Sequence, residues 1–267
     1  MPNNITKLSY YACGYCVNNL KAVFKHTPKE LRKFAAGVFL LHHRLHGYIL
    51  FDTGYSLDIY NAGVIGKLYH LLNPTFVTQE DMIDYQLKQE GIQPSAINYI
   101  ILSHLHPDHV GGLAKFKQAK VIISEKAYIN YKNPKLRDLI IPKLMPSWFE
   151  DQLIILKDDD LRSCSTSYFS AYDLFSDRSV LITNLDGHAY GQICALINEQ
   201  MFLGADTCWG LDLLDKAKDM KLFARLVQND YAAYMKSTQV LEHMRKDGIR
   251  LWFSHDKYNQ KELFTDE

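Results

Sequence analysis

Residues 103–112 read SHLHPDHVGG and place four side chains that can bind a metal ion within six residues: His104, His106, Asp108 and His109. Neutral imidazole and carboxylate groups are both ligands for zinc and its first-row neighbours. A buried core would not tolerate so many polar groups without partners, and a solvated surface would not need this spacing. The pattern therefore predicts a metal site and disfavours the alternative, a histidine-rich surface loop.

The flanking residues place this stretch at the end of a strand. The apolar run 99–102 predicts a buried strand. Pro107 and the pair Gly111 and Gly112 predict a turn, with a short helix beginning near Pro107. The four side chains would then leave a strand end and the first turn of a helix, which is where open α/β sheets hold their sites.

The composition favours a globular protein with a small-molecule substrate. The chain has 267 residues, 47% of them hydrophobic, so we expect one domain over residues 1–267 with a sizeable core. The formal net charge is +0. A neutral chain has no general attraction for nucleic acid or for an anionic membrane, which argues against a nuclease and against both of those partners.

The cysteines and the apolar segments indicate a cytoplasmic protein. An odd, sparse set argues against a disulfide framework; its members are Cys13, Cys16, Cys164, Cys194 and Cys208. Cys13 and Cys16 form a CxxC pair, but no second pair completes a zinc ribbon, and a structural role is favoured over a redox role. We see no signal peptide and no run long enough to span a membrane.

Hydrophobic patterning predicts a strand-rich chain. The expected strands cover 38–41, 48–51, 98–103, 121–123, 172–175, 180–183, 193–197, 201–204 and 250–253. The expected helices cover 78–91, 125–131 and 229–247, the first beginning at a near capping box formed by Thr78 and Asp81. We interpret residues 55–78 as loops and short helices, and residues 133–150 as an irregular insertion that forms a lid.

Three more candidate ligands follow predicted strands. His188 comes after 180–185, Asp206 after 201–204, and His255 after 250–253. Together with the four side chains of the first motif they make seven nitrogen and oxygen donors. Such a set suits two metal ions, each with room for a ligand derived from water.

The ordered set resembles the metallo-β-lactamase-fold hydrolase superfamily, from about residue 38 to residue 256. The resemblance implies an α+β fold, a four-layer αββα sandwich with the site along one edge of its two sheets. It also implies that Asp52, in the turn Asp52-Thr53-Gly54, supports the ligands from behind. The ligands that it implies are His104, His106 and His188 for one metal, Asp108, His109 and His255 for the other, and Asp206 as a bridge between them.

The chemistry implied is metal-assisted hydrolysis. Bound metal lowers the pKa of water toward about 7, so a hydroxide between the two ions would attack a carbonyl or phosphorus centre, and the second ion would polarise the oxygen under attack. Asp108 is the candidate that passes a proton to the leaving group. Zinc is the expected metal, although iron or manganese would accept the same donors.

Within the superfamily, the chain most resembles acyl-homoserine lactone lactonase-like proteins. It shares their length and the ending FSHD at residues 253–256. It has Trp209 where those lactonases carry a tyrosine near the substrate, and Asp186 where they carry a proline. Asp206 stands where true β-lactamases carry a cysteine. We therefore expect hydrolysis of an ester or lactone bond in a small, acyl-bearing substrate.

Other functions remain open on the sequence. A glyoxalase-II-like thioesterase or a phosphodiesterase would use the same donors. A protein of a different class, a non-catalytic binding module that contains metal, would also keep them. Aromatic residues make up 12% of the chain and would suit either an apolar substrate pocket or the core. The oligomeric state is not predicted.

Overall fold

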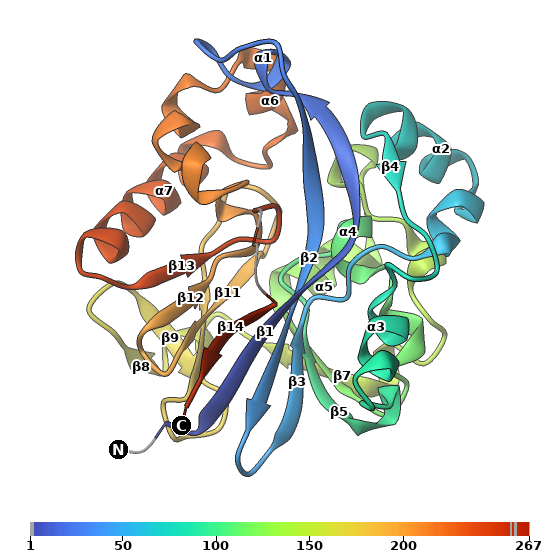
Figure 1. The fold of residues 1–267 in the computed structure, drawn as a ribbon. Coiled ribbons are helices and arrows are strands. Elements are labelled where there is room, and N and C mark those ends of the chain that lie inside the picture. The colour runs from blue at the N-terminus through green and yellow to red at the C-terminus, as the bar shows by residue number, and fades with distance from the viewer. Residues whose placement is uncertain (1–2, 257, 259–260, 267) are drawn as a thin grey trace.

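The computed structural model describes residues 3–256, 258 and 261–266. Two β-sheets lie face to face, and helices cover the outer side of each sheet (Figure 1). The two termini lie close together at one end of the sandwich. This is the α+β, four-layer αββα arrangement that the sequence predicts.

The first sheet has eight strands within the described residues, in the order β14-β1-β2-β3-β5-β6-β7, with β4 paired to β1. The strands β3, β5, β6 and β7 run parallel to one another, and the remaining pairs of this sheet are antiparallel. Their bounds are β1 Ile5–Asn19, β2 Leu31–His43, β3 Gly47–Phe51, β4 Thr75–Phe76, β5 Ile97–Ile101, β6 Lys120–Ser124, β7 Leu153–Leu156 and β14 Glu262–Thr265.

The second sheet has six strands within the described residues, in the order β13-β12-β11-β10-β9-β8. All pairs are antiparallel except that β12 and β13 run parallel. The strand bounds are β8 Cys164–Ser165, β9 Ser170–Asp173, β10 Val180–Asn184, β11 Ile193–Ile197, β12 Met201–Leu203 and β13 Arg250–Trp252. Because β12 and β13 are parallel, the residues that follow them leave the sheet at the same edge.

Helices connect the strands and cover the outer faces. None of them, within the part of the chain that the structure describes, is long and apolar enough to cross a membrane. The α-helices are α1 Leu20–Val23, α2 Gly63–Leu72, α3 Ile83–Gln89, α4 Pro107–Val110, α5 Glu125–Lys132, α6 Leu222–Val227 and α7 Tyr231–Lys246. The 3₁₀ helices are η1 Leu57–Asn61, η2 Pro94–Ala96, η3 Leu113–Lys115, η4 Leu136–Asp138, η5 Pro142–Leu144, η6 Glu150–Gln152, η7 Asp160–Arg162, η8 Ala205–Thr207 and η9 Leu211–Asp219.

The central strands are apolar along their whole length because both of their faces are buried. Successive side chains of a strand point to opposite faces. Phe51 and Ile122 therefore pack between the sheets against Ile182, while their neighbours Leu50 and Val121 pack under the outer helices. Burying one such side chain contributes about 1.5–3 kcal/mol, so these strands form the rigid centre from which the site projects.

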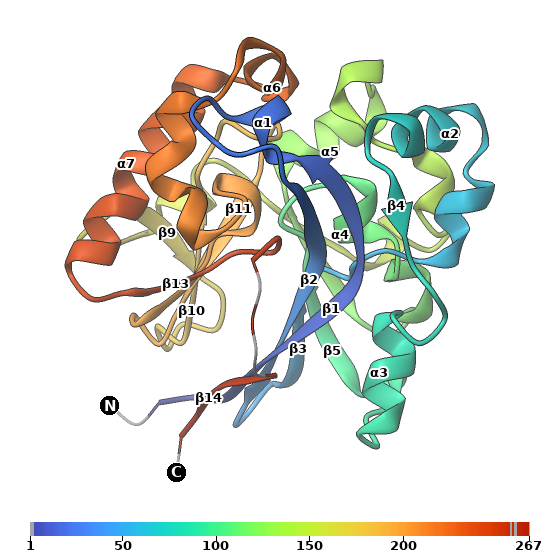
Figure 2. The same ribbon diagram turned by 45° about the horizontal axis from the view of Figure 1, so that its top comes forward.

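Residues 55–78 form loops and helices as expected, among them α2 (Figure 2). The structure differs from the sequence expectations in two places. The strand β1 was not predicted, and it contains the CxxC pair, Cys13 and Cys16. Asp81 accepts hydrogen bonds from the backbone N–H and hydroxyl of Thr78, but this motif closes a turn, and α3 begins only at Ile83.

Candidate metal centre

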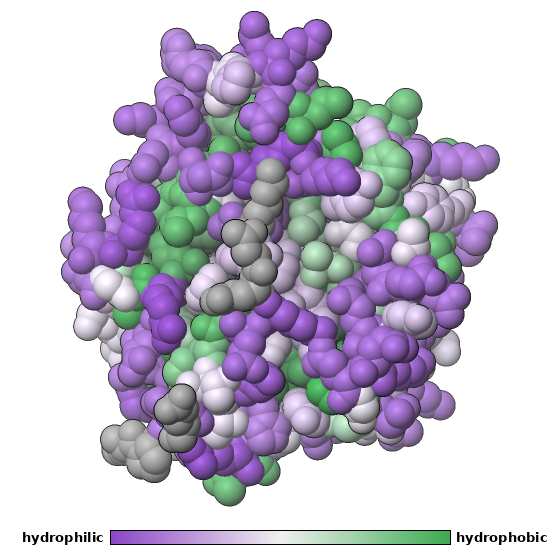
Figure 3. Space-filling view, in the orientation of Figure 1, coloured by the Kyte–Doolittle hydropathy of each residue, from purple (hydrophilic) through white to green (hydrophobic). Residues whose placement is uncertain are grey.

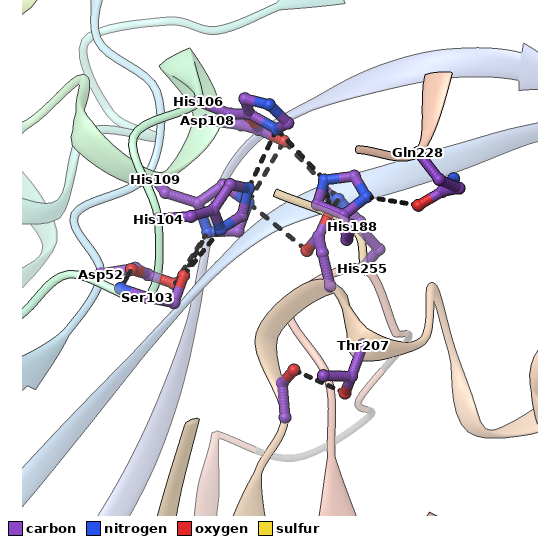
Figure 4. A network of polar contacts seen from close by, with 12 residues as sticks. Asp52, Ser103, His104, His106, Asp108, His109, His188, Thr207, Gln228 and His255 are labelled. Carbon is purple, nitrogen blue, oxygen red and sulfur yellow. Dashed lines mark hydrogen bonds and ion pairs between the residues drawn. The ribbon is translucent and has the colours of Figure 1, made fainter. Parts of the chain in front are cut away.

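The seven predicted donors lie together, and Figure 4 labels all of them except Asp206. The first sheet supplies the donors that follow β5 and those on α4. The second sheet supplies the donors that follow β10, β12 and β13. The members of this group are His104, His106, Asp108, His109, His188, Asp206 and His255.

Three imidazole nitrogens converge on one side of the group. His104 Nε2 lies 2.9 Å from His106 Nδ1, and His188 Nε2 lies 3.1 Å from the same His106 atom. Each of these nitrogens carries a lone pair in one tautomer of the neutral ring. The three rings can therefore donate to a single ion.

A second set of donors lies beside the first. Asp108 Oδ2 is 3.6 Å from His109 Nε2 and 3.6 Å from His255 Nε2. Asp206 lies between the two sets: its Oδ1 is 3.4 Å from His109 Nε2, and its Oδ2 is 2.9 Å from His255 Nε2 and 3.3 Å from His188 Nε2. Its carboxylate thus contacts rings of both sets.

The burial of these donors fits a metal ion. His109 Nε2 and Asp206 Oδ1 are buried and have no hydrogen-bond partner within the described part of the chain. Leaving such atoms unpaired is costly, and coordination would satisfy both. Three triads among the described residues have their ligand atoms within 4.8 Å of one another: His104, His106 and His188; His104, His109 and Asp206; Asp108, His109 and His255.

Electrostatics keeps several donors in the form that binds metal. Burial, together with neighbouring histidines, holds the pKa of His104 and of His106 well below the usual range, and burial also lowers the pKa of His188. Burial alone would raise the pKa of Asp206, but His255, His109 and His188 outweigh it and hold that pKa well below its usual value. Burial thus favours the neutral form of His104, His106 and His188, and the Asp206 carboxylate is ionised. At His109 and His255 the facing carboxylates outweigh burial and raise the pKa of the ring.

Asp52 fixes the orientation of His109. Its carboxylate accepts hydrogen bonds from Ser103 N at 2.7 Å, Ser103 Oγ at 2.8 Å and His109 Nδ1 at 2.7 Å. Because Nδ1 of His109 donates to Asp52, Nε2 is left facing Asp108 and Asp206. The position predicted for Asp52 behind the ligands agrees with this geometry.

Two further supporting contacts come from distant residues and were not predicted. Gln228 Oε1 lies 3.0 Å from His188 Nδ1, and the backbone carbonyl of Ala35 lies 2.6 Å from His255 Nδ1. Each acceptor takes the proton of one ring nitrogen and leaves the other for a metal. Gln228 follows α6 and Ala35 lies within β2, so no local sequence signal connects either of them to a histidine.

The two glycines after the first motif allow a close backbone approach. A Cβ at Gly111 would lie 2.7 Å from Gly54 O, and one at Gly112 would lie 2.5 Å from Thr53 O. Thr53 in turn donates from its backbone N–H and its hydroxyl to His109 O, at 2.7 and 2.9 Å. The turn after β3 therefore packs directly on α4 and holds it in place.

The CxxC pair is not at a strand–helix turn and forms no disulfide. Burial holds the pKa of the Cys13 thiol well above its usual value and raises the pKa of Cys16 to about 12. Both thiols therefore stay protonated and unreactive. A Cβ at Gly54 would lie 2.2 Å from Cys13 Cβ, so Cys13 packs tightly under the turn that carries Asp52.

Trp209 stands beside the donors. Its ring meets that of His188 edge to face at 6.0 Å, and it packs against Phe24 at 6.4 Å and Phe34 at 6.3 Å. Phe34 also meets the ring of His255 at 6.0 Å. These rings form an aromatic wall on the second-sheet side of the site.

A small pocket, open to solvent, borders the donors. Its lining includes His106 and His188, and the insertion 133–150 contributes a wall through η4 and the residues after it. The apolar lining residues are Leu105, Ala127, Ile140, Leu226 and Val227, and the polar ones include Asn130, Arg137, Asp138 and Asn229. Hydrophobic residues also reach the surface at the upper edge of the molecule, in the region of α6 and α2 (Figure 3).

Comparison with known proteins agrees with this fold. Residues 38–161 match the model of the metallo-beta-lactamase superfamily. An N-acyl homoserine lactonase of a Bacillus species is 33% identical over 152 residues, which are 52% of this chain and 58% of that protein. A probable metallo-hydrolase of Mycobacterium tuberculosis is 34% identical over 96 residues, 34% of this chain and 31% of its own length. The chain thus spans less than two thirds of these relatives.

Solved structures extend the likeness to nearly the whole chain. An N-acyl homoserine lactone hydrolase with N-hexanoyl-L-homoserine bound at its catalytic metal center has a TM-score of 0.73 at 22% identity, covering 96% of this chain and 94% of that one. The dizinc quorum-quenching lactonase AidC has a TM-score of 0.69 at 18% identity, covering 97% and 90%. The chain has the metallo-β-lactamase fold, and residues 38–161 match the model of that superfamily. Its relatives include proteins named as N-acyl homoserine lactonases.

Proposed function

We propose that this protein is a metal-dependent hydrolase that cleaves an ester or lactone bond of a small, acyl-bearing substrate. The observation that carries the proposal is the convergence of seven buried histidine and aspartate donors beside an open pocket. The lactonases among its relatives support this reaction class.

We propose that the donors hold two divalent ions, zinc in the first instance, with iron or manganese as alternatives. The structure of a dizinc lactonase with the same fold supports two zinc ions. Bound ions would lower the pKa of a water toward about 7 and polarise the substrate carbonyl. His104, His106 and His188 would hold one ion, Asp108, His109 and His255 the other, and Asp206 both.

The protein's own side chains then orient and move protons. Asp108 lies beside His109 and His255, and we propose that it also passes a proton to the leaving oxygen. Asp52 and Gln228 keep the rings of His109 and His188 in the required tautomer. Trp209 closes the second-sheet side of the site against water and offers an indole N–H to the substrate.

The pocket walls indicate how a substrate would lie. Ile140, Leu226 and Val227 offer apolar contact to an acyl chain, while Asn130 and Asn229 offer hydrogen bonds to its polar end. We propose that the insertion 133–150 acts as a lid, because it contributes Ile140 and Arg137 to the wall. The net charge of +0 gives no general attraction for nucleic acid.

The decisive experiment is ring opening of a long-chain N-acyl homoserine lactone by protein of measured metal content. We expect turnover that rises with metal content and is lost in Asp108→Asn. A panel of an aryl ester, a thioester and a phosphodiester follows under the same conditions. Failure of the fully metal-loaded protein on both the lactone and the aryl ester would overturn the proposal, and selective turnover of the thioester or phosphodiester would replace it.

A further inference from the structure

A chain of buried hydroxyl groups leads away from Asp108. Tyr69, on α2, donates from Oη to Asp108 Oδ1 at 3.3 Å. Tyr55, in the turn after β3, has its Oη 2.7 Å from Tyr69 Oη. Tyr55 is 0% exposed and Tyr69 is 4% exposed, and both lie in the apolar core under the outer helices of the first sheet.

The direction of this chain follows from its end. An ionised carboxylate can only accept, and a tyrosine has one hydroxyl proton. Because the Tyr69 proton points to Asp108, the oxygen of Tyr69 must accept the proton of Tyr55.

The chain continues to the CxxC pair of β1. The side chains of Tyr55 and Cys16 are within hydrogen-bonding reach, and Asn18 Nδ2 lies 3.9 Å from Cys16 Sγ. Asn18 also donates to Asn73 Oδ1 at 3.2 Å, just beyond the end of α2. A row of polar groups thus connects the first strand and α2 with the metal-binding helix α4.

The effect on Asp108 is to give its two oxygens different partners. Oδ1 is taken by Tyr69, whereas Oδ2 is the atom that lies 3.6 Å from both His109 Nε2 and His255 Nε2. A carboxylate held in this way offers one oxygen to an ion rather than two. Outer partners of this kind orient the ligands of metal sites.

Simple core packing does not explain the two hydroxyls. Phenylalanine would fill nearly the same space among Ile59, Leu105 and Val110, with no polar atom to satisfy. A hydroxyl in an apolar core is costly unless it is hydrogen-bonded. The hydrogen bond that Tyr69 donates ends on a candidate metal ligand, which gives the hydroxyl a purpose beyond the core.

We propose that Tyr69, itself held by Tyr55, is a positioning residue that reserves Oδ1 of Asp108 and presents Oδ2 to the metal held with His109 and His255. The inference rests on the proposed metal site. It concerns retention of the ion and does not require any particular substrate.

The test is Tyr69→Phe, with metal retention measured by chelator competition in the absence of substrate. We expect one of two ions to be lost at a chelator concentration about 10–100-fold lower than in the wild type. The other ion should be less affected, and kcat should fall more than KM changes. Tyr55→Phe should also lower the chelator concentration that removes this ion, but by a smaller factor, because Tyr55 acts through Tyr69.

The matched control is Tyr11→Phe. Tyr11 is also buried, at 1% exposed, and donates to Glu90 Oε2 at 2.7 Å. It should keep wild-type metal retention, so equal retention in Tyr69→Phe and Tyr11→Phe would overturn the proposal. If Tyr69→Phe fails to fold, Tyr55→Phe decides in the same way. A protein that binds two ions normally but opens no ester would refute the proposed function and leave this inference standing.

Discussion

The two sheets build the candidate metal centre in different ways. The first sheet supplies four donors from one short stretch of sequence. A single buried turn supports this stretch, because the Asp52 carboxylate in it accepts three hydrogen bonds from Ser103 and His109. The second sheet supplies three donors from three separate strand ends, and Gln228 and Ala35 support them individually. One side is a local motif with a shared support, whereas the other exists only when the sheet is assembled.

Asp206 is where the two sides meet, so its removal should have the largest effect. Asp206→Ala removes the carboxylate that contacts His109 on one side and His188 and His255 on the other. We expect loss of bound metal and a fall in kcat/KM of about 10³-fold, or about 4 kcal/mol. Elemental analysis measures the metal content, and hydrolysis of the best substrate measures the change in kcat/KM. Retention of both ions would show that the two sides do not share this ligand.

The shared support of the first sheet should matter next most. Asp52→Ala leaves His109 and Ser103 without their buried acceptor, and we expect a loss of about 3–5 kcal/mol in the free energy of unfolding. Asp84→Ala is the control: Asp84 is also a buried carboxylate, but its ion-pair partner Lys88 is half-exposed, so we expect a smaller loss than for Asp52→Ala. Urea unfolding of both variants decides. Equal losses of unfolding free energy in the two variants would mean that the contacts of Asp52 stabilise the fold no more than an ordinary ion pair does.

The individual supports of the second sheet should cost less. Gln228→Leu removes the acceptor of His188 Nδ1 and nothing from the rings of the first sheet. We expect a decrease of roughly 10-fold in affinity for one ion, with the free energy of unfolding close to the wild-type value. Chelator titration followed by calorimetry separates the two quantities. A loss of stability as large as that of Asp52→Ala would erase the contrast between the sheets.

A buried histidine outside the site provides the smallest expected effect. His43 Nδ1 accepts from the backbone N–H groups of Leu45 and His46, while Nε2 donates to Asp177. Burial lowers the pKa of His43 below 6.5, despite Asp177. On acidification, His43 therefore takes up a proton more readily in the unfolded chain than in the folded protein. The contribution of neutral His43 to the free energy of unfolding is present above pH 6.5 and decreases as the pH falls below it.

We expect the stability of the His43→Gln variant to depend less on pH than that of the wild type between pH 7.5 and 5.5. Asp177 does not confuse the result, because its pKa is lowered from 3.8 and it titrates at a more acidic pH. Urea midpoints at the two pH values measure the difference. A wild-type midpoint that rises on acidification would contradict the expected sign.

The contrast between the sheets also explains what could be predicted from the sequence. The run from Ser103 to Gly112 carries donors, strand end and helix start together, so its role is readable locally. His188, Asp206 and His255 were found because each follows an apolar strand. The fold and the convergence of these donors agree with the prediction, while the role of each donor at a metal remains proposed.

What escaped prediction depends on contacts between distant residues. Tyr55 and Tyr69 have the pattern of core aromatics, and only the assembled fold brings their hydroxyls to Asp108. The backbone carbonyl of Ala35 has no side-chain signature at all. The strand β1 was missed because Lys7, Ser9 and Gly14 interrupt its apolar pattern.

The pairing of β14 with β1 has a consequence for synthesis on the ribosome. Lys7 pairs with Thr265, so β1, which is synthesised first, can complete that edge of the first sheet only after β14 has been synthesised. His255 is also the last donor to emerge. Pairings between such distant residues form slowly, and domains fold as units during synthesis. Metal should therefore be loaded after translation, because a chain stalled before His255 has only six of the seven donors.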